Sequence, residues 1–229
     1  MTAPVLAHPP TLADRVVGAL RDEIRARRLV PGELYSVQQV AELLGVSRSP
    51  AREGLLKLAE AGLVRFTRNR GFRIVLPEPR DVAEIFAVRL ALEPAAAARA
   101  ASRGAVLTLE QLDDATHLGD EASFWEADRA LHDAILRAGG NRRAAEIVAG
   151  LRATTALLTP PTSAGDRSLA AIRDEHAPVV AAVAAGDAAG AERAMREHLE
   201  HTGRLLVARV ADRPVEDPAV ERIWSEAVN

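Results

Sequence analysis

The chain has 229 residues, a formal net charge of −3, 48% hydrophobic residues and only 3% aromatic residues. It contains no cysteine, which excludes disulfides, thiolate metal sites and cysteine nucleophiles and suits a reducing cytoplasm, where we expect the protein to act. No apolar run approaches the roughly 18 residues of a membrane span, so we expect no membrane partner. Residues 1–10 hold three prolines and no charged side chain, which predicts a disordered arm rather than a signal peptide.

The charge is divided unevenly along the chain. Residues 11–76 carry a net charge of +5, and the remainder carries −8. A basic segment on an acidic remainder indicates that the N-terminal part meets a polyanion. The length fits two domains of about 70 and 150 residues, and the many Ala-rich runs favour a mostly α fold.

Three helices are predicted in the N-terminal part. The first covers Leu12–Arg28, where apolar residues recur every four positions. The second begins after Ser36, and Gln39 completes a capping box with it. After a very short turn, the third helix begins with Ser47 or Ser49 as its N-cap.

Two short alternating segments follow the third helix. Leu63–Thr67 and Gly71–Val75 flank the tripeptide Arg68-Asn69-Arg70, which predicts a β-hairpin with a basic tip. The order helix, helix, tight turn, helix, hairpin predicts a winged helix-turn-helix domain over residues 11–76.

Residues 77–79, Pro-Glu-Pro, are expected to form a stiff linker. An all-α domain folded as an antiparallel helical bundle is predicted to follow over residues 80–212. The tail, residues 213–229, is predicted to be loose, with a short helix near Ile223 as an alternative. The predicted helices of the second domain are Arg80–Arg103, Thr108–Leu118, Ala122–Ala138, Arg142–Leu158, Leu169–Ala185 and Ala188–Val210.

Helix-turn-helix modules place the start of their second helix in the major groove of DNA. Arg48 and Arg52 are four apart at that position, so they share one helical face and can grip guanine or phosphate. An ordinary solvated helix, with Glu53 screening Arg52, is the alternative. The candidate DNA contacts of the helix and the wing are Ser47, Arg48, Ser49, Arg52, Arg68, Arg70 and Gly71.

This N-terminal part resembles the GntR family of bacterial regulators, which implies a winged helix that binds double-stranded DNA. Two residues depart from the family pattern. Gln38 stands where some members carry a DNA-contacting arginine, and Gly54 stands where alanine is usual, at a cost of about 1 kcal/mol that closer packing would offset. The segments that carry the resemblance are Pro31–Leu34, Val40–Glu53, Gly62–Val64 and Arg70–Gly71.

The second domain contains a candidate metal site. Asp128 and His132 are four apart on one predicted helix, and His176 and His198 lie on two later helices. A carboxylate and three imidazoles can bind a divalent cation in the core of a bundle. From the spacing alone, polar surface or capping roles are the favoured interpretation of these side chains, because lone histidines are seldom ligands.

The region is similar to the FadR C-terminal effector domain called FCD, through the segments Phe124–Asn141, Glu175–His176, Gly186–Asp187 and Glu197–His198. The resemblance implies that Asp128, His132, His176 and His198 bind a divalent ion, with zinc expected and nickel or manganese as alternatives. Arg89 lies in a segment that resembles the first FCD helix. It is predicted either to hold an effector carboxylate or to pair with Glu93 on the surface.

Asn141 is interpreted in two ways. It either contacts the effector or caps a helix end after Gly139–Gly140.

These observations predict a homodimeric transcriptional regulator, most simply a repressor, that binds a palindromic operator and responds to a small organic acid. A metal-dependent hydrolase that uses the Asp/His₃ site is the alternative. That hypothesis leaves the winged helix unexplained, and no H-E-x-x-H spacing is present. An architectural DNA-binding protein without an effector is a third interpretation, against which the polar residues on apolar helices argue.

Overall fold

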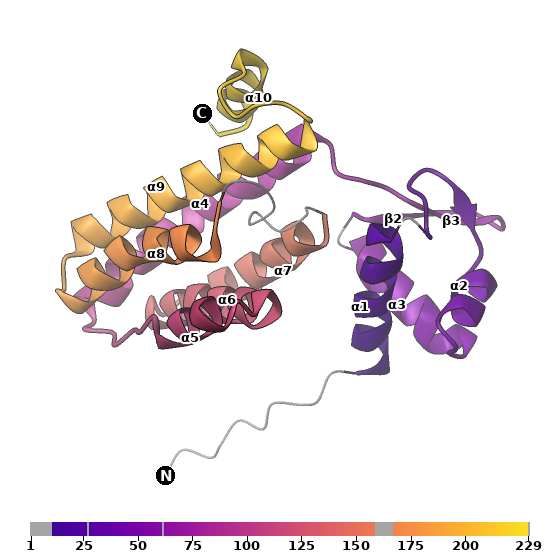
Figure 1. Cartoon of the computed structure of the whole chain (residues 1–229), viewed down its shortest axis with the longest axis horizontal. Helices are drawn as coiled ribbons and strands as arrows, with labels where there is room; N and C mark the ends of the chain where they lie inside the picture. The colour runs from indigo at the N-terminus through magenta and orange to yellow at the C-terminus, as the bar shows by residue number, and fades with distance from the viewer. Residues whose placement is uncertain (1–10, 27, 61, 159–166, 229) are drawn as a thin grey trace, which may run out of the picture. The chain divides into compact units, whose positions relative to one another are not determined.

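The computed structural model describes residues 11–26, 28–60, 62–158 and 167–228. The chain folds into two compact units that divide between Leu76 and Pro77, which Figure 1 colours indigo to purple and purple to yellow. The predicted disordered arm, residues 1–10, lies outside the described residues. None of the described helices is long and apolar enough to cross a membrane.

The described part of the N-terminal unit contains three helices, α1 (Leu12–Arg25), α2 (Val37–Leu43) and α3 (Arg48–Glu60). The capping box predicted at the start of α2 is confirmed: the backbone N–H of Gln39 donates to Ser36 Oγ, and the Ser36 N–H donates to Gln39 Oε1. The helix α1 ends three residues earlier than predicted. The Arg28 and Leu29 N–H groups both donate to the Glu23 carbonyl, so the backbone has already left the helical path.

A small antiparallel sheet completes this unit, with β1 (Leu34–Tyr35), β2 (Val64–Thr67) and β3 (Gly71–Ile74) in the order β1-β3-β2. The hairpin is confirmed, whereas the sequence does not predict β1, because two residues carry no readable alternation. Gly71 has φ 123°, and a Cβ there would lie 2.1 Å from the carbonyl oxygen of Tyr35. The close pairing of β1 with β3 therefore requires glycine at this position.

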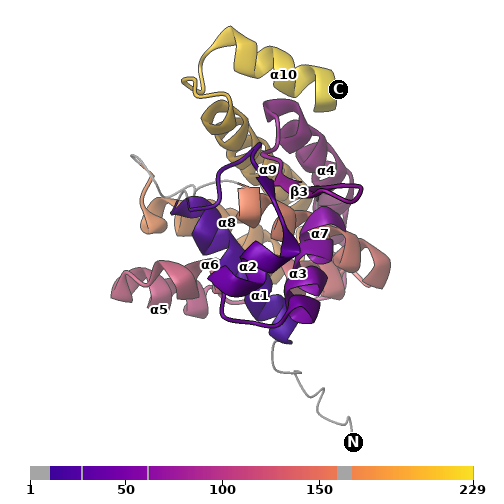
Figure 2. The same cartoon turned by 90° about the vertical axis from the view of Figure 1, so that its right-hand side faces the viewer.

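The helix α3 packs against both α1 and α2, as Figure 2 shows. Gly54 is buried on α3, and a Cβ there would lie 2.5 Å from Val16 Cγ1 on α1. The glycine therefore permits a close α1–α3 packing, which is the expected compensation for its helical cost. The apolar core of the unit is formed chiefly by Val16, Leu20, Val40, Leu55, Leu58 and Phe72.

The C-terminal unit is entirely helical over its described residues. Its longest helices, α4 and α9, run antiparallel and side by side, and α8 packs against both of them (Figure 1). The bounds are α4 (Pro79–Ser102), α5 (Glu110–Leu118), α6 (Glu121–Ala138), α7 (Arg142–Leu158), α8 (Leu169–Ala184), α9 (Ala188–Val210) and α10 (Pro218–Val228). The predicted bounds of α7 and α9 are met to the residue, and those of the other helices predicted in residues 80–212 differ by at most two residues at each end.

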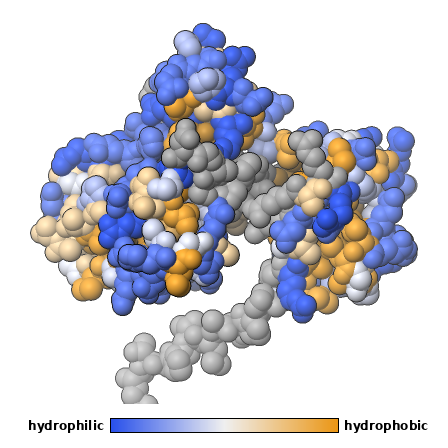
Figure 3. Space-filling model, in the orientation of Figure 1, coloured by the Kyte–Doolittle hydropathy of each residue, from blue (hydrophilic) through white to orange (hydrophobic). Residues whose placement is uncertain are grey.

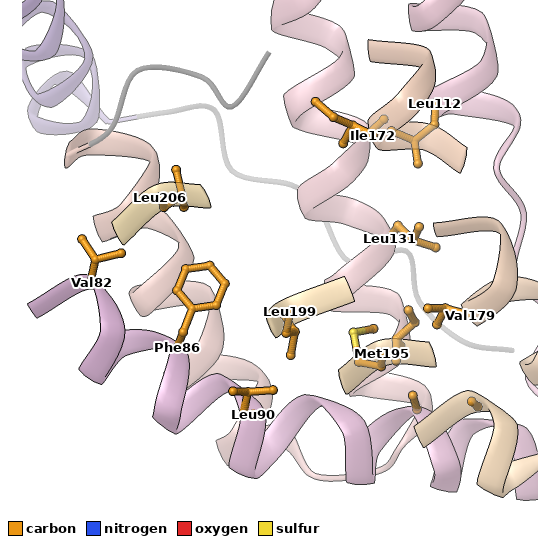
Figure 4. Packing of buried hydrophobic residues seen from close by; sticks show 14 of the residues in the cluster. Val82, Phe86, Leu90, Leu112, Leu131, Ile172, Val179, Met195, Leu199 and Leu206 are labelled. Carbon is orange, nitrogen blue, oxygen red and sulfur yellow. The ribbon is translucent and has the colours of Figure 1, made fainter. Parts of the chain in front are cut away.

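A single large apolar cluster joins α4, α6, α8 and α9. Figure 4 shows Phe86 and Leu90 of α4 directed toward the space shared with Met195 and Leu199 of α9. Hydrophilic residues cover much of the visible surface in Figure 3, while hydrophobic residues show through on both units. The interior is thus mainly aliphatic, as the low aromatic content requires.

The prediction that the tail after Asp212 is loose is wrong, and its alternative, a short helix near Ile223, is confirmed. Residues 218–228 form α10, which packs on α4 and α9. Trp224 is 2% exposed, and its ring lies where a Cβ on Gly203 would be 2.3 Å away. A large aromatic anchor seated over a glycine of another helix explains the order, and no local periodicity could reveal that contact.

Candidate functional site

The predicted DNA-reading residues lie on the surface of the N-terminal unit. Ser47 directly precedes α3, and Arg48, Ser49 and Arg52 are exposed in its first turns. Arg48 and Arg52 stand one turn apart, so they share the same face of α3. The geometry matches a helix whose N-terminal N–H groups and arginines are free to meet a polyanion.

The wing presents a second set of exposed basic residues. Arg68 and Arg70 flank Asn69, whose φ of 56° makes the tight turn between β2 and β3. The guanidinium carbon of Arg52 lies 5.9 Å from the centre of the Phe66 ring on β2, which ties the α3 arginine to the wing. Gly71, predicted to let the wing approach DNA, has a structural role here, because it lets β3 approach β1.

Gln38, which replaces an expected arginine, has a partner within the protein. Its Nε2 donates to Glu42 Oε1 at 2.6 Å along α2. A DNA contact from this position would have to displace that hydrogen bond.

In the C-terminal unit, the three predicted histidine ligands are brought together and buried. His132 on α6, His176 on α8 and His198 on α9 are 0%, 1% and 7% exposed, and one nitrogen of each lies within 4.8 Å of the others. Their ring centroids are 4.3–5.4 Å apart. The alternative of surface or capping roles for these side chains is therefore wrong.

Hydrogen bonds orient two of these imidazoles. His176 Nδ1 lies 2.8 Å from the Ile172 carbonyl oxygen, which can only accept, so Nδ1 carries the proton. His132 Nδ1 donates in the same way to Glu93 Oε2 at 2.5 Å. In neutral imidazoles both Nε2 lone pairs then face each other across 3.3 Å, an arrangement that calls for a shared cation.

Asp128 brings a further acceptor to the same point. Its Oδ1 is 3.0 Å from His176 Nε2 and 4.0 Å from His132 Nε2. Ligand atoms about 2.1 Å from a tetrahedral zinc ion are separated by roughly 3.4 Å, so these spacings bracket the expected one. The donor set therefore fits a borderline divalent cation, as the sequence predicted.

The environment favours the neutral form of His132 and His198 and the ionised form of Glu93. Burial lowers the pKa of His132 to about 4, and burial together with His176 lowers the pKa of His198 to about 3. Burial opposes ionisation of Glu93, but the charge of Arg89 and the hydrogen bond from His132 outweigh it and hold the pKa of Glu93 below its ordinary value. Neutral imidazole and carboxylate are the forms that bind metal.

Sequence reasoning missed the residues that support these ligands. Arg152 on α7 pairs with Asp128, and Arg167 pairs with Glu175, whose Oε2 lies 3.4 Å from His198 Nδ1. The one signal in the sequence was an arginine inside an otherwise apolar stretch of α7.

The structure places Arg89 inside the unit, where its side chain is 4% exposed. Its Nε donates to Glu93 Oε1 at 2.6 Å, so the predicted pair with Glu93 forms, but in the interior rather than on the surface. Because Glu93 also accepts a hydrogen bond from His132, Arg89 helps to fix the position of the histidine cluster through Glu93.

Asn141 is exposed and caps α7. Its Oδ1 accepts from the Ala144 N–H at 3.1 Å, so it serves the start of α7 rather than the end of α6. This capping contact accounts for the position of the side chain.

Comparison with known proteins agrees with both units. Residues 12–74 match the family described as bacterial regulatory proteins, gntR family, and residues 84–201 match the FCD domain. The chain belongs to the GntR family, in the group with an FCD domain. It is therefore a DNA-binding transcriptional regulator, and the resemblance seen in the sequence is confirmed.

Two relatives that are named as transcriptional regulators match this chain over most of their length. The HTH-type transcriptional regulator LutR of Bacillus subtilis is 30% identical over 80% of this chain and 95% of its own. The HTH-type transcriptional repressor RspR of Escherichia coli is 28% identical over 79% of this chain and 82% of its own. Such relatives are not enzymes, so the hydrolase alternative is wrong.

Solved structures support the fold. E. coli McbR/YncC superimposes with a TM-score of 0.62 at 24% identity, covering 86% of this chain and 97% of its own. Lar, which controls the agr system of Listeria monocytogenes, superimposes with a TM-score of 0.61 at 20% identity, covering 90% of this chain and 99% of its own.

Proposed function

We propose that this GntR regulator is a repressor whose operator affinity is set by a small carboxylate bound at a metal centre in the FCD unit. The observation that carries the proposal is the convergence of Asp128 Oδ1 with the Nε2 atoms of His132 and His176. Three acceptors at 3.0–4.0 Å with no proton between them are costly to bury unless a cation lies among them.

Asp128, His132, His176 and His198 would hold the ion. Zinc suits the mixture of imidazole and carboxylate, and nickel or manganese are the alternatives. The bound ion would act as a Lewis acid that attracts a carboxylate oxygen of the effector. The chain's own contribution is orientation: Glu93 and the Ile172 carbonyl fix the imidazole tautomers, and Arg152 fixes the carboxylate of Asp128.

Operator binding would use the exposed residues of the N-terminal unit. Arg48 and Arg52 would enter the major groove, Ser47 and Ser49 would meet phosphates, and the wing arginines would reach the neighbouring backbone or minor groove. A homodimer formed through the helical unit would match a palindromic operator.

The two activities would be coupled through α4. This helix begins at Pro79, and only two residues separate it from Leu76, the last residue of the N-terminal unit. The same helix carries Glu93, which accepts a hydrogen bond from His132. An effector that binds one arrangement of α4 and α6 better than another shifts the population of the DNA-binding form by that difference in affinity.

A thermal-shift screen of small carboxylates in the presence of zinc tests the proposal. An acid at 100 times its dissociation constant should stabilise the wild type by about 2.7 kcal/mol and leave His132→Ala unaffected. His117→Ala, which removes an exposed histidine on α5, is the matched control and should respond like the wild type. An equal response of wild type and His132→Ala would contradict the proposal.

A further inference from the structure

The formal charges of the side chains around the histidine cluster sum to zero before any ion is added. Each arginine beside the cluster is paired with one carboxylate, so the six side chains sum to zero. With neutral imidazoles, a divalent cation would bring the buried site to a net charge of +2. The pairs are Arg89 with Glu93, Arg152 with Asp128, and Arg167 with Glu175.

A buried net charge of +2 is costly in a low-dielectric interior. Water molecules bring no charge to it, and one carboxylate group neutralises half of it. A ligand that carries two negative charges would neutralise the site completely.

Buried polar atoms without a hydrogen-bond partner belong to the same ion pairs and to one histidine, whose Nδ1 lies 3.4 Å from Glu175 Oε2 without making a hydrogen bond. Within the described ranges, only three buried side-chain nitrogen or oxygen atoms lack a hydrogen-bond partner: Arg152 Nε, Arg167 Nη1 and His198 Nδ1. All three belong to residues of this cluster or to their ion-pair partners. The two guanidinium N–H groups can only donate, so they require oxygen acceptors that the described residues do not supply.

We propose that the effector is a small dicarboxylate, with one carboxylate group on the ion and further oxygens accepting from Arg152 and Arg167. This inference rests on the proposed function and adds the charge class of the ligand and two specificity-determining residues. Arg152 and Arg167 lie on α7 and just before α8, so the second carboxylate would bridge segments that the histidines on α6, α8 and α9 only partly connect.

The test uses the full-length protein loaded with cobalt, whose visible absorption reports the metal site. Acetate is compared with oxalate, malonate, succinate and glutarate by calorimetric titration, and each is followed by the change in the cobalt spectrum. At least one dicarboxylate should bind about tenfold or more tightly than acetate, because each charge-assisted hydrogen bond contributes roughly 1.5–3 kcal/mol.

Two arginine variants then locate the second carboxylate. Arg152→Gln and Arg167→Gln should each lower the ratio of dicarboxylate to acetate affinity about tenfold, and this ratio removes any loss common to both acids that follows from their contacts with Asp128 and Glu175. Arg137→Gln is the control, because Arg137 lies on α6 with 67% of its side chain exposed. A retained cobalt spectrum shows that each variant is folded around the ion.

The outcomes separate the two proposals. If wild-type protein binds no cobalt, the proposed function fails and this inference fails with it. If cobalt binds but acetate binds as tightly as every dicarboxylate, or neither arginine variant lowers the ratio of dicarboxylate to acetate affinity, only the dicarboxylate inference is overturned.

Discussion

The two polar sites of this regulator follow opposite physical rules. On α3 and the wing, the arginines are exposed to solvent, although Arg52 also lies over the Phe66 ring. In the helical unit, each charged group around the histidines is buried or partly buried and is paired with another. We therefore expect the protein to stay folded when a residue of the first site is replaced. Residues of the second site belong to the core of the helical unit, so their replacement should also lower its stability.

The largest expected change in binding affinity tests the exposed side of this comparison. Arg48→Ala combined with Arg52→Ala should weaken operator binding by about a hundredfold or more, because each lost contact costs roughly 1–3 kcal/mol. The melting temperature should stay within about a degree of wild type. Fluorescence anisotropy on DNA selected by the protein from a random pool measures the affinity.

The control for that variant is Arg142→Ala combined with Arg143→Ala, which removes two exposed charges from α7. Unchanged DNA affinity in the α3 variant, or an equal loss in the α7 variant, would show that α3 is not the reading helix.

A substitution in the core of the helical unit should lower the free energy of unfolding rather than the affinity for DNA. Trp224→Ala removes the anchor of α10 and should cost about 3–5 kcal/mol of unfolding free energy, as expected for a buried aromatic side chain. Urea denaturation followed by circular dichroism measures it. A loss below about 1 kcal/mol would indicate that α10 is only loosely attached.

The pH dependence of the metal-free protein tests the buried histidines. Their folded pKa values are lowered to about 4 and about 3 from 6.5, so between pH 6.5 and 4 the unfolded chain binds the extra protons. Stability should therefore fall with falling pH, by about 2 kcal/mol for each of His132 and His198 at pH 5. Urea midpoints at pH 7.5 and pH 5, with a chelator present, measure the fall.

The variant His132→Gln should show a smaller fall over the same interval. A wild-type midpoint that does not move would mean that the imidazoles are already protonated, or exposed, in the folded state.

The smallest expected change in affinity concerns Glu93, which supports the proposed metal ligand His132. Glu93→Gln keeps the shape of the side chain but removes the charge that fixes His132, and it should lower cobalt affinity about 10–100-fold. Glu84→Gln, an exposed position on the same helix, is the control. Equal cobalt affinity of the two variants would assign Glu93 to stability alone.

The sequence predicted what depends on local patterns and near neighbours. The capping box at Ser36, the exposed arginines of α3 and the bounds of α7 and α9 follow from residue type and spacing. The clustering of the histidines came from a family resemblance, because spacing alone left surface roles open.

Other features depend on contacts between distant segments. The two-residue strand β1 exists only because β3 pairs with it. The helix α10 is ordered because the Trp224 ring packs against Gly203 of α9. Glu93 and Arg152 support the ligands from two further helices, so their roles depend on tertiary packing that no local pattern encodes.

The most direct test of the central proposal is operator affinity with and without the acid found in the carboxylate screen, measured by anisotropy on zinc-loaded protein. We expect the acid to change the dissociation constant of wild type, and to leave that of His176→Ala unchanged although the variant still binds the operator. An equal change in both proteins, or no change in wild type, would contradict control of DNA binding through the histidine cluster.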